Sequence, residues 1–307
     1  MQDITMALVE NQTTPSTAIN SSQTSESPGV DAPQYHMVLL CIYSIVLLSG
    51  TVSLCLMVHI IRSSTASITS ISILNLIFAH FLFLVTVPFR IYYYVTDNWG
   101  LSHGWCKVVS SMIHIHMYMS FIFYVIILVT RLMAFYNGAE HLASLRKIQA
   151  LVVSAMVWIA VLVTVPIIIH FSYGKNDDYT TETQCFKFGK SIKAGAKVVN
   201  YIVSTLIIVV ATVLTVLQAN VLRVLYKKHS EGCSSQQEFG AQHKSMCFAL
   251  IMVVCLIPYH LFRLCYLGDL SLEGANEVFL SLTTFNCLDM LTFLGRRNCF
   301  MCFGWAC

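Results

Sequence analysis

Seven long stretches of the chain are almost uniformly apolar, and polar residues gather between them. A helix needs about 20 mostly apolar residues to cross a membrane, because the hydrocarbon core is about 30 Å thick and a helix rises about 1.5 Å per residue. Strands of a membrane barrel would alternate polar and apolar residues instead. The pattern therefore predicts an all-α membrane protein, a seven-transmembrane helix bundle. The expected spans are Met37–Ile61, Ile68–Val95, Trp105–Phe135, Ile148–Phe171, Val198–Tyr226, Ser245–Leu267 and Val278–Gly295.

Composition supports a lipid environment. Of 307 residues, 56% are hydrophobic and only 11% are charged, with a mean hydropathy of +0.70, whereas about a quarter of a soluble domain is charged. Segment 1–36 is instead rich in Ser, Thr, Asn and Gln and lacks the apolar core of a signal peptide, so we expect a disordered tail. The helical domain is expected over 37–295, followed by a short tail at 296–307.

The polar tail indicates the orientation of the chain. It contains two N-glycosylation sequons, at Asn11 and Asn20. Glycans are added on the lumenal side of the membrane, so use of these sites requires an extracellular N-terminus. After seven spans the C-terminus would then be cytoplasmic.

Two cysteines stand apart from those inside the apolar spans. Cys106 begins the third span and Cys185 lies in the loop before the fifth span, both on the predicted outer side. Because that compartment is oxidising, we expect a Cys106–Cys185 disulfide that holds the loop over the bundle.

Basic residues stand beside aromatic and cysteine residues in the C-terminal tail, which favours a short amphipathic helix at the inner membrane surface. Cys299 and Cys302 are candidate palmitoylation sites. Their Cys-x-x-Cys spacing is half of a zinc motif, but no second pair or nearby histidine completes it. We therefore predict no metal site and no cofactor.

Ionisable residues within membrane spans are costly and indicate functional sites. His260 and Arg263 share a face of the sixth span, and Arg90 and Lys197 lie near the outer ends of two others. The pattern predicts an outward-facing pocket for an anionic small molecule or lipid. The alternatives are snorkelling of basic side chains to the interface and neutralisation by nearby acidic residues. The predicted pocket residues are Arg90, His114, Met117, Lys197, Tyr259, His260 and Arg263.

A series of short motifs follows the spans in order: Leu74-Asn75-Leu76-Ile77-Phe78-Ala79, Val87-Pro88-Phe89, Trp99 before Cys106, Arg131, Trp158, Pro166, Pro258-Tyr259-His260 and Asn286-Cys287-Leu288-Asp289. Their order and spacing resemble those of the rhodopsin-like G-protein-coupled receptors. The Pro258-Tyr259-His260 and Leu288-Asp289 motifs resemble those of the branch that contains purine-nucleotide and related receptors. This resemblance implies a plasma-membrane receptor that signals to heterotrimeric G proteins, with Arg131, Glu238, His80, Asp289, Leu256 and Pro258 in activation and coupling.

Several switch positions depart from the family pattern. His80 replaces the acidic residue of the second span, so sodium binding there should be weak or absent. We expect His80 to pair with Asp289, which would reduce the cost of burying both. Thr130 cannot form the salt bridge to Arg131 that an Asp would make, and Glu238 is the available acidic partner. Loss of that contact favours either ligand-independent activity or altered coupling.

The alternatives to signalling are a non-signalling surface protein and, as a separate class, an enzyme, transporter or channel. The altered switch residues leave room for a non-signalling surface protein, such as a decoy, scavenger or partner subunit of another receptor. No H-E-x-x-H, G-x-S-x-G or phosphate-loop motif indicates an enzyme. His114 and His116 do not suggest a metal site, because residues two apart on a helix face away from each other. No nucleic-acid partner is expected.

Overall fold

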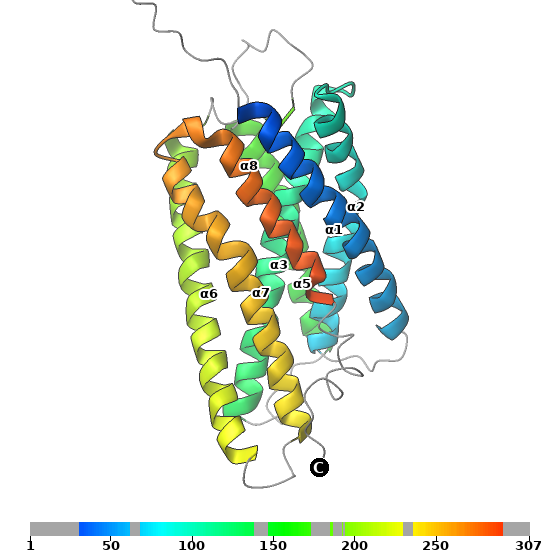
Figure 1. Ribbon diagram of the computed structural model, residues 1–307. Helices are drawn as coiled ribbons and strands as arrows, with labels where there is room; N and C mark the ends of the chain where they lie inside the picture. The colour runs from blue at the N-terminus through cyan, green and yellow to red at the C-terminus, as the bar shows by residue number, and fades with distance from the viewer. Residues whose placement is uncertain are drawn as a thin grey trace, which may run out of the picture.

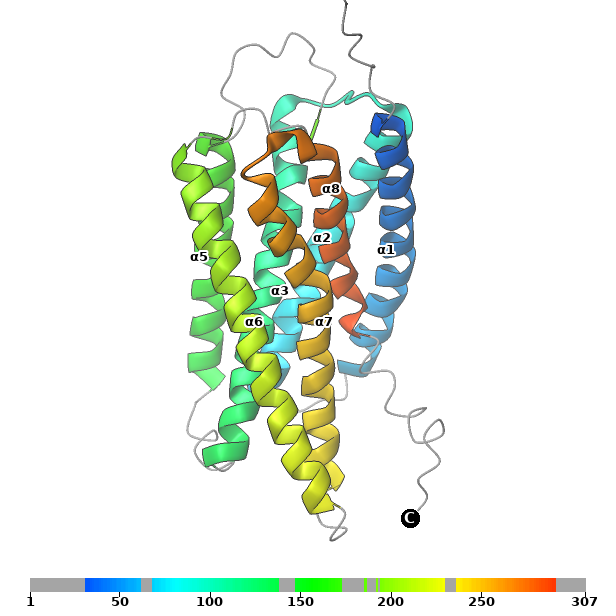
Figure 2. The same ribbon diagram turned by 60° about the vertical axis from the view of Figure 1, so that its left-hand side comes forward.

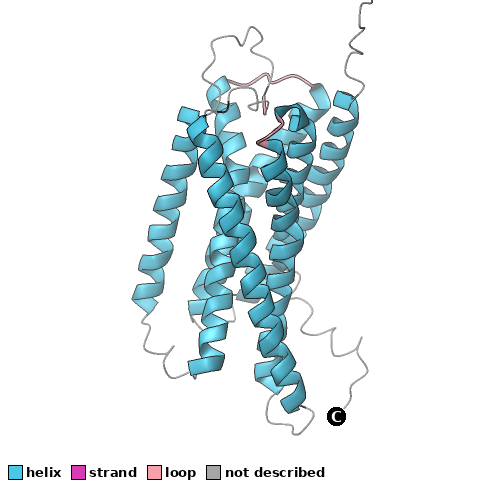
Figure 3. Ribbon diagram, turned by 90° about the vertical axis from the view of Figure 1, so that its left-hand side faces the viewer, coloured by secondary structure: helices cyan, strands magenta, loops and turns pink. Residues whose placement is uncertain are grey.

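The computed structural model describes residues 31–61, 68–137, 147–172, 185–186, 192, 194–229 and 236–290. Six long helices and a shorter seventh segment form an upright bundle (Figure 1). The long helices are α1 (Asp31–Ile61), α2 (Ile68–Thr96), α3 (His103–Asn137), α5 (Lys147–Ser172), α6 (Ala194–His229) and α7 (Gln236–Tyr266). The described part of the chain contains only helices, turns and short loops (Figure 3). The all-α prediction is confirmed.

The seventh span is built from two joined segments, α8 (Glu273–Leu282) and the 3₁₀ helix η4 (Thr283–Met290), after a short 3₁₀ turn η3 (Leu270–Leu272). It lies between α1 and α7 (Figures 1 and 2). The hydroxyls of Ser281, Thr283 and Thr284 each donate to the carbonyl three residues earlier, at 2.7, 2.6 and 2.6 Å. Such side-chain bonds compete with the α-helical pattern. An eight-residue 3₁₀ helix is unusually long and is typical of a hinge.

The outer surface of the bundle is apolar. Six of the helices are long and apolar enough to cross a membrane. Along α5 and α6, large hydrophobic side chains such as Ile148, Met156, Ile202 and Val209 are exposed. An apolar surface of this extent is stable in lipid rather than in water. These side chains therefore face the hydrocarbon.

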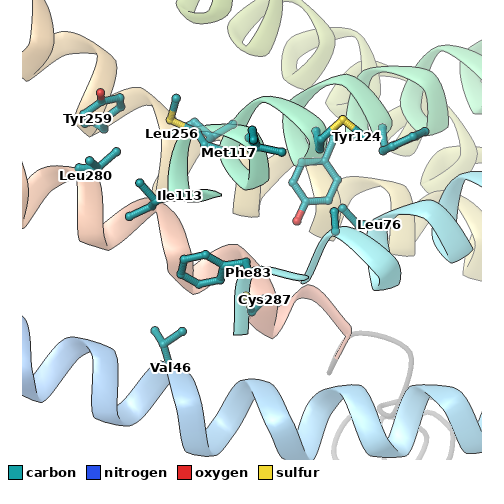
Figure 4. Close-up of a cluster of buried hydrophobic side chains, with 14 of the residues drawn as sticks. Val46, Leu76, Phe83, Ile113, Met117, Tyr124, Leu256, Tyr259, Leu280 and Cys287 are labelled. Atoms are coloured by element: carbon teal, nitrogen blue, oxygen red, sulfur yellow. The ribbon is translucent and has the colours of Figure 1, made fainter. Parts of the chain in front are cut away.

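The core combines hydrophobic packing with a few polar ties. Figure 4 shows side chains of the first, second, third, sixth and seventh spans meeting at the centre, with Met117 close to Leu256 and Phe83 close to Cys287. At the edge of the bundle, the Trp158 indole donates to Asn75 Oδ1 at 2.8 Å, and Asn75 Nδ2 donates to Ser154 at 3.0 Å. These bonds hold α5, which buries little of its surface, against α2.

The predicted Cys106–Cys185 disulfide is present, with a Cα–Cα distance of 5.8 Å. It joins the start of α3 to the segment before α6 and marks one end of the bundle, which we call the disulfide end. The predicted sites at Asn11, Asn20, Cys299 and Cys302, together with the C-terminal amphipathic helix, lie outside the described residues.

Candidate functional site

A cavity of about 410 Å³ lies in the disulfide half of the bundle. This volume falls within the range of about 300–1,000 Å³ that is usual for small-molecule sites. Its wall comes from α3, α5, α6, α7 and α8, with Phe186 as the contribution of the disulfide-held loop. Residues from five separate helices thus converge on one space.

One side of the cavity is almost entirely apolar. The third, fourth and fifth spans contribute the polar residues Ser110, His114, Thr164 and Asn200. Their other lining side chains are aliphatic or aromatic: Tyr118, Phe121, Ile122, Ala160, Val161, Val165, Ile168, Ile169, Val199, Val203, Leu206 and Ile207. A hydrocarbon group placed here would leave water and gain about 25 cal/mol for each Å² buried.

The opposite side carries polar groups centred on Arg263. Its guanidinium donates to Asn276 Oδ1 at 3.3 Å and to Asn200 Oδ1 at 3.4 Å. It also lies 5.2 Å from the centre of the Tyr266 ring. These contacts link α6, α7 and α8 and hold a buried positive charge at the cavity wall.

Two acidic residues lie on the same wall, Glu273 and Glu277. Glu277 Oε2 is 3.9 Å from Arg90 Nη1. Arg90 is 1% exposed and also donates to the Tyr43 hydroxyl at 3.2 Å and to the Val109 carbonyl at 3.3 Å. The polar side of the cavity therefore presents both signs of charge, which lessens the positive potential that the sequence predicted.

Phe186 separates the cavity from the buried Arg90. Its ring lies 4.4 Å from the Arg90 guanidinium and packs against Tyr93, Tyr94 and Trp99. Its backbone has a φ of 67°, a left-handed conformation that is uncommon for a bulky residue. The adjacent disulfide at Cys185 fixes this position, so the loop places one aromatic ring in the roof of the cavity.

Three of the seven predicted pocket residues line this cavity: His114, Tyr259 and Arg263. Arg90, Met117, Lys197 and His260 are not part of its wall. The expectation that His260 and Arg263 face one cavity is wrong. His260 Nδ1 turns toward α6, where it lies 3.2 Å from Ser204 Oγ. Tyr259, four residues before Arg263, lines the cavity instead. Spacings of three and four residues both place side chains on one face of a helix, so the sequence pattern does not distinguish the two.

Sequence reasoning missed Asn200, Asn276 and the apolar wall. The two asparagines were visible as polar residues near membrane spans, and their role follows from their contacts with Arg263. The apolar wall could not be distinguished from lipid-facing residues, because both are aliphatic.

A second polar cluster occupies the centre of the bundle. His80 Nε2 lies 3.2 Å from Asp289 Oδ1, so the predicted pairing is present. The Tyr124 hydroxyl donates to Asp289 Oδ2 at 2.6 Å. The other nitrogen of His80, Nδ1, lies 2.8 Å from His116 Nε2. These contacts join α2, α3 and η4.

Comparison with known proteins matches residues 32–300 to the family described as 7 transmembrane receptor (rhodopsin family). The chain belongs to this family. It is accordingly a multi-pass membrane receptor and not an enzyme.

Individual relatives agree with this assignment. The receptor is 34% identical over 305 residues to human Probable G-protein coupled receptor 141. This alignment covers 92% of this chain and 98% of the relative. It is 27% identical over 284 residues to chimpanzee Probable G-protein coupled receptor 34, covering 85% and 73%. It is 24% identical over 257 residues to mouse Lysophosphatidic acid receptor 6, covering 80% and 73%.

At the end opposite the disulfide, side-chain amides join three helices of the receptor. Gln218 Nε2 donates to Gln242 Oε1 at 2.6 Å, and Gln242 Nε2 donates to the Arg131 carbonyl at 3.4 Å. The side chain of Glu238, the acidic partner predicted for Arg131, lies outside the described part of the structure. The observed link between α3 and α7 is therefore an amide one turn further along α7. Leu256 is fully buried in the core, and Pro258 lies inside α7.

Proposed function

We propose that the receptor binds a single-chain lipid with an anionic head group at its disulfide end and transmits binding to a heterotrimeric G protein at the opposite end. The disulfide end is then extracellular and the end with Arg131 cytoplasmic. The observation that carries the proposal is the division of the cavity into an apolar side and a polar side centred on Arg263.

The apolar side of the cavity fits an acyl chain. Its wall extends over α3, α5 and α6 and offers hydrophobic contact along most of its length. A small hydrophilic ligand would leave this surface unused, whereas a hydrocarbon chain gains from burial. A relative named Lysophosphatidic acid receptor 6 is consistent with this chemistry.

The polar side fits a phosphate-bearing head group. Arg263 is already held by two asparagine side chains, so its planar guanidinium is positioned to donate to phosphate oxygens without reordering. Glu273 and Glu277 lie nearby, which favours a head group that also carries an ammonium group. His114 and Tyr259 are further polar groups on the wall.

The proposal is tested by adding micellar lysophospholipids to cells that express the receptor and recording activation of each main G-protein class. The panel contains three lipids with the same acyl chain. Their head groups are a bare phosphate, an amine-bearing phosphate and an uncharged glycerol. We expect a response to the phosphate lipids alone. Failure of every lipid in the presence of demonstrated surface expression would contradict the proposal.

An Arg131→Ala variant at matched surface level separates signalling from mere binding. Loss of the response in this variant, with lipid binding retained, supports coupling through the end that bears Arg131. Binding without a response in the unaltered receptor would instead favour the decoy or scavenger function that the altered switch residues suggest.

The amide link at the cytoplasmic end is expected to restrain activation. Gln242→Leu removes its bonds to Gln218 and to the Arg131 carbonyl, each worth roughly 0.5–1.5 kcal/mol. If these bonds favour the resting arrangement, ligand-free signalling should rise about 2- to 10-fold, measured at matched surface expression. The control variant His243→Ala alters the exposed neighbouring residue and should leave ligand-free signalling unchanged. A fall in ligand-free signal in Gln242→Leu would show that the link supports the active state.

A further inference from the structure

We propose that His80, His116 and Cys287 form a zinc site at the centre of the bundle. Within the described ranges, these three residues have ligand atoms that all lie within 4.8 Å of one another, and all three side chains are buried. They come from α2, α3 and η4. The site is separate from the lipid cavity, whose wall includes none of them.

The distances suit a small cation with nitrogen and sulfur ligands. His80 Nδ1 and His116 Nε2 are 2.8 Å apart, and His116 Nε2 and Cys287 Sγ are 3.5 Å apart. In a tetrahedral zinc site, bonds of about 2.0 Å to nitrogen and 2.3 Å to sulfur place pairs of ligand atoms roughly 3.3–3.6 Å apart. Binding would require the two imidazoles to move apart by about half an ångström. The ligand atoms of His80 and Cys287 also lie within 4.8 Å of each other.

The surroundings orient the histidines as ligands. Asp289 lies on His80 Nε2, so the proton of that ring sits on Nε2 and the lone pair of Nδ1 faces His116. The Tyr124 hydroxyl in turn holds the carboxylate. The His116 ring stacks on Phe83 with ring centres 4.4 Å apart. A carboxylate behind a ligating histidine is the usual second partner in zinc sites.

Two buried polar atoms beside the cluster lack hydrogen-bond partners among the described residues. They are His116 Nδ1 and the hydroxyl oxygen of Ser120, one helical turn along α3. An unsatisfied buried polar group is costly. With zinc on His116 Nε2, the proton of that ring moves to Nδ1. Ser120 lies four residues further along α3 and so on the same face as His116, and its hydroxyl is a candidate for the fourth position.

Charge also balances at the site. Zinc binds the Cys287 thiolate, and the thiol proton is released to solvent without any oxidation. The two positive charges of the ion are then matched by the thiolate and by the Asp289 carboxylate. Imidazole and thiolate ligands select zinc over sodium, magnesium or calcium, which prefer oxygen. His80 stands where the family has an acidic residue, so a nitrogen ligand replaces an oxygen ligand at this position.

Bound zinc would join α2 and α3 to the 3₁₀ segment of the seventh span. Cys287 and Asp289 are both part of η4. Coordination bonds from the ion to α2 and α3 would therefore hold η4 in the described arrangement. An ion that binds one arrangement of a two-state protein shifts its population toward that arrangement. In this proposal zinc therefore stabilises the described arrangement of the seventh span.

The test uses the full-length receptor in lipid nanodiscs, stripped with a chelator and then titrated with zinc chloride. We expect one zinc per chain after washing, a higher midpoint of thermal unfolding, and an X-ray absorption spectrum with one sulfur neighbour at about 2.3 Å. Magnesium and calcium chlorides at the same concentration should have no effect.

Variants assign the ion to this cluster. Cys287→Ala and His116→Phe should lose the bound zinc and the thermal shift, and His116→Phe also keeps an aromatic ring against Phe83. Cys247→Ala, which alters a cysteine outside the cluster, should keep both. Absence of zinc from the washed wild-type receptor would overturn the proposal. So would zinc retention by both Cys287→Ala and His116→Phe.

Discussion

In the Arg263→Ala variant, the concentration of phosphate lipid that gives half-maximal signalling is expected to rise about 100-fold, since hydrogen bonds to charged groups contribute about 1.5–3 kcal/mol. Arg263 is the cationic side chain on the described cavity wall. Its removal also leaves Asn200 and Asn276 without their shared donor. The measurement is a dose–response curve for G-protein activation at matched surface expression.

Two control variants sharpen this result. Arg263→Lys keeps the charge but loses the planar pair of donors, so it should recover only part of the potency. Lys197→Ala removes a basic residue at the same end of the bundle that is not part of the cavity wall, and its curve should match the wild type. Equal losses in Lys197→Ala and Arg263→Ala would indicate a general effect of charge at this end and would contradict a phosphate contact at Arg263.

Replacement of Asp289 alone should severely destabilise the receptor. Asp289 is fully buried, and its carboxylate accepts from Tyr124 and pairs with His80. Removing one partner of a buried pair costs about 3–5 kcal/mol, because the other is left without compensation. Asp289→Leu should therefore reach the cell surface at a small fraction of the wild-type level and unfold at a lower temperature in detergent.

The double variant tests whether the two residues are coupled. Replacing both groups of a buried pair by apolar residues is often neutral or stabilising. We expect His80→Leu combined with Asp289→Leu to recover much of the surface expression and thermal stability lost in Asp289→Leu. Strictly additive effects of the two substitutions on the unfolding free energy would show that the contact carries no coupling. The double variant should also fail to bind zinc, because His80 supplies one ligand.

The amino-acid sequence by itself determined the membrane architecture. Long apolar stretches have no stable alternative to helices in lipid, since every backbone polar group must find a partner within its own segment. The Cys106–Cys185 pairing could also be predicted, because few cysteines lie outside the apolar spans on the predicted oxidising side. The His80–Asp289 contact was predictable for a related reason: two ionisable groups deep in membrane helices are costly unless they meet.

Only the tertiary structure decided which polar residues share a site. Helix rotation separates His260 from the cavity and places Tyr259 there, a difference of one position that periodicity alone does not resolve. Arg90 became part of a buried network with Tyr43, Val109 and Glu277 instead of a pocket wall. The cluster of His80, His116 and Cys287 brings together residues from three helices. Its members are far apart along the chain, so their convergence depends on how the helices pack, which no local pattern of residues encodes.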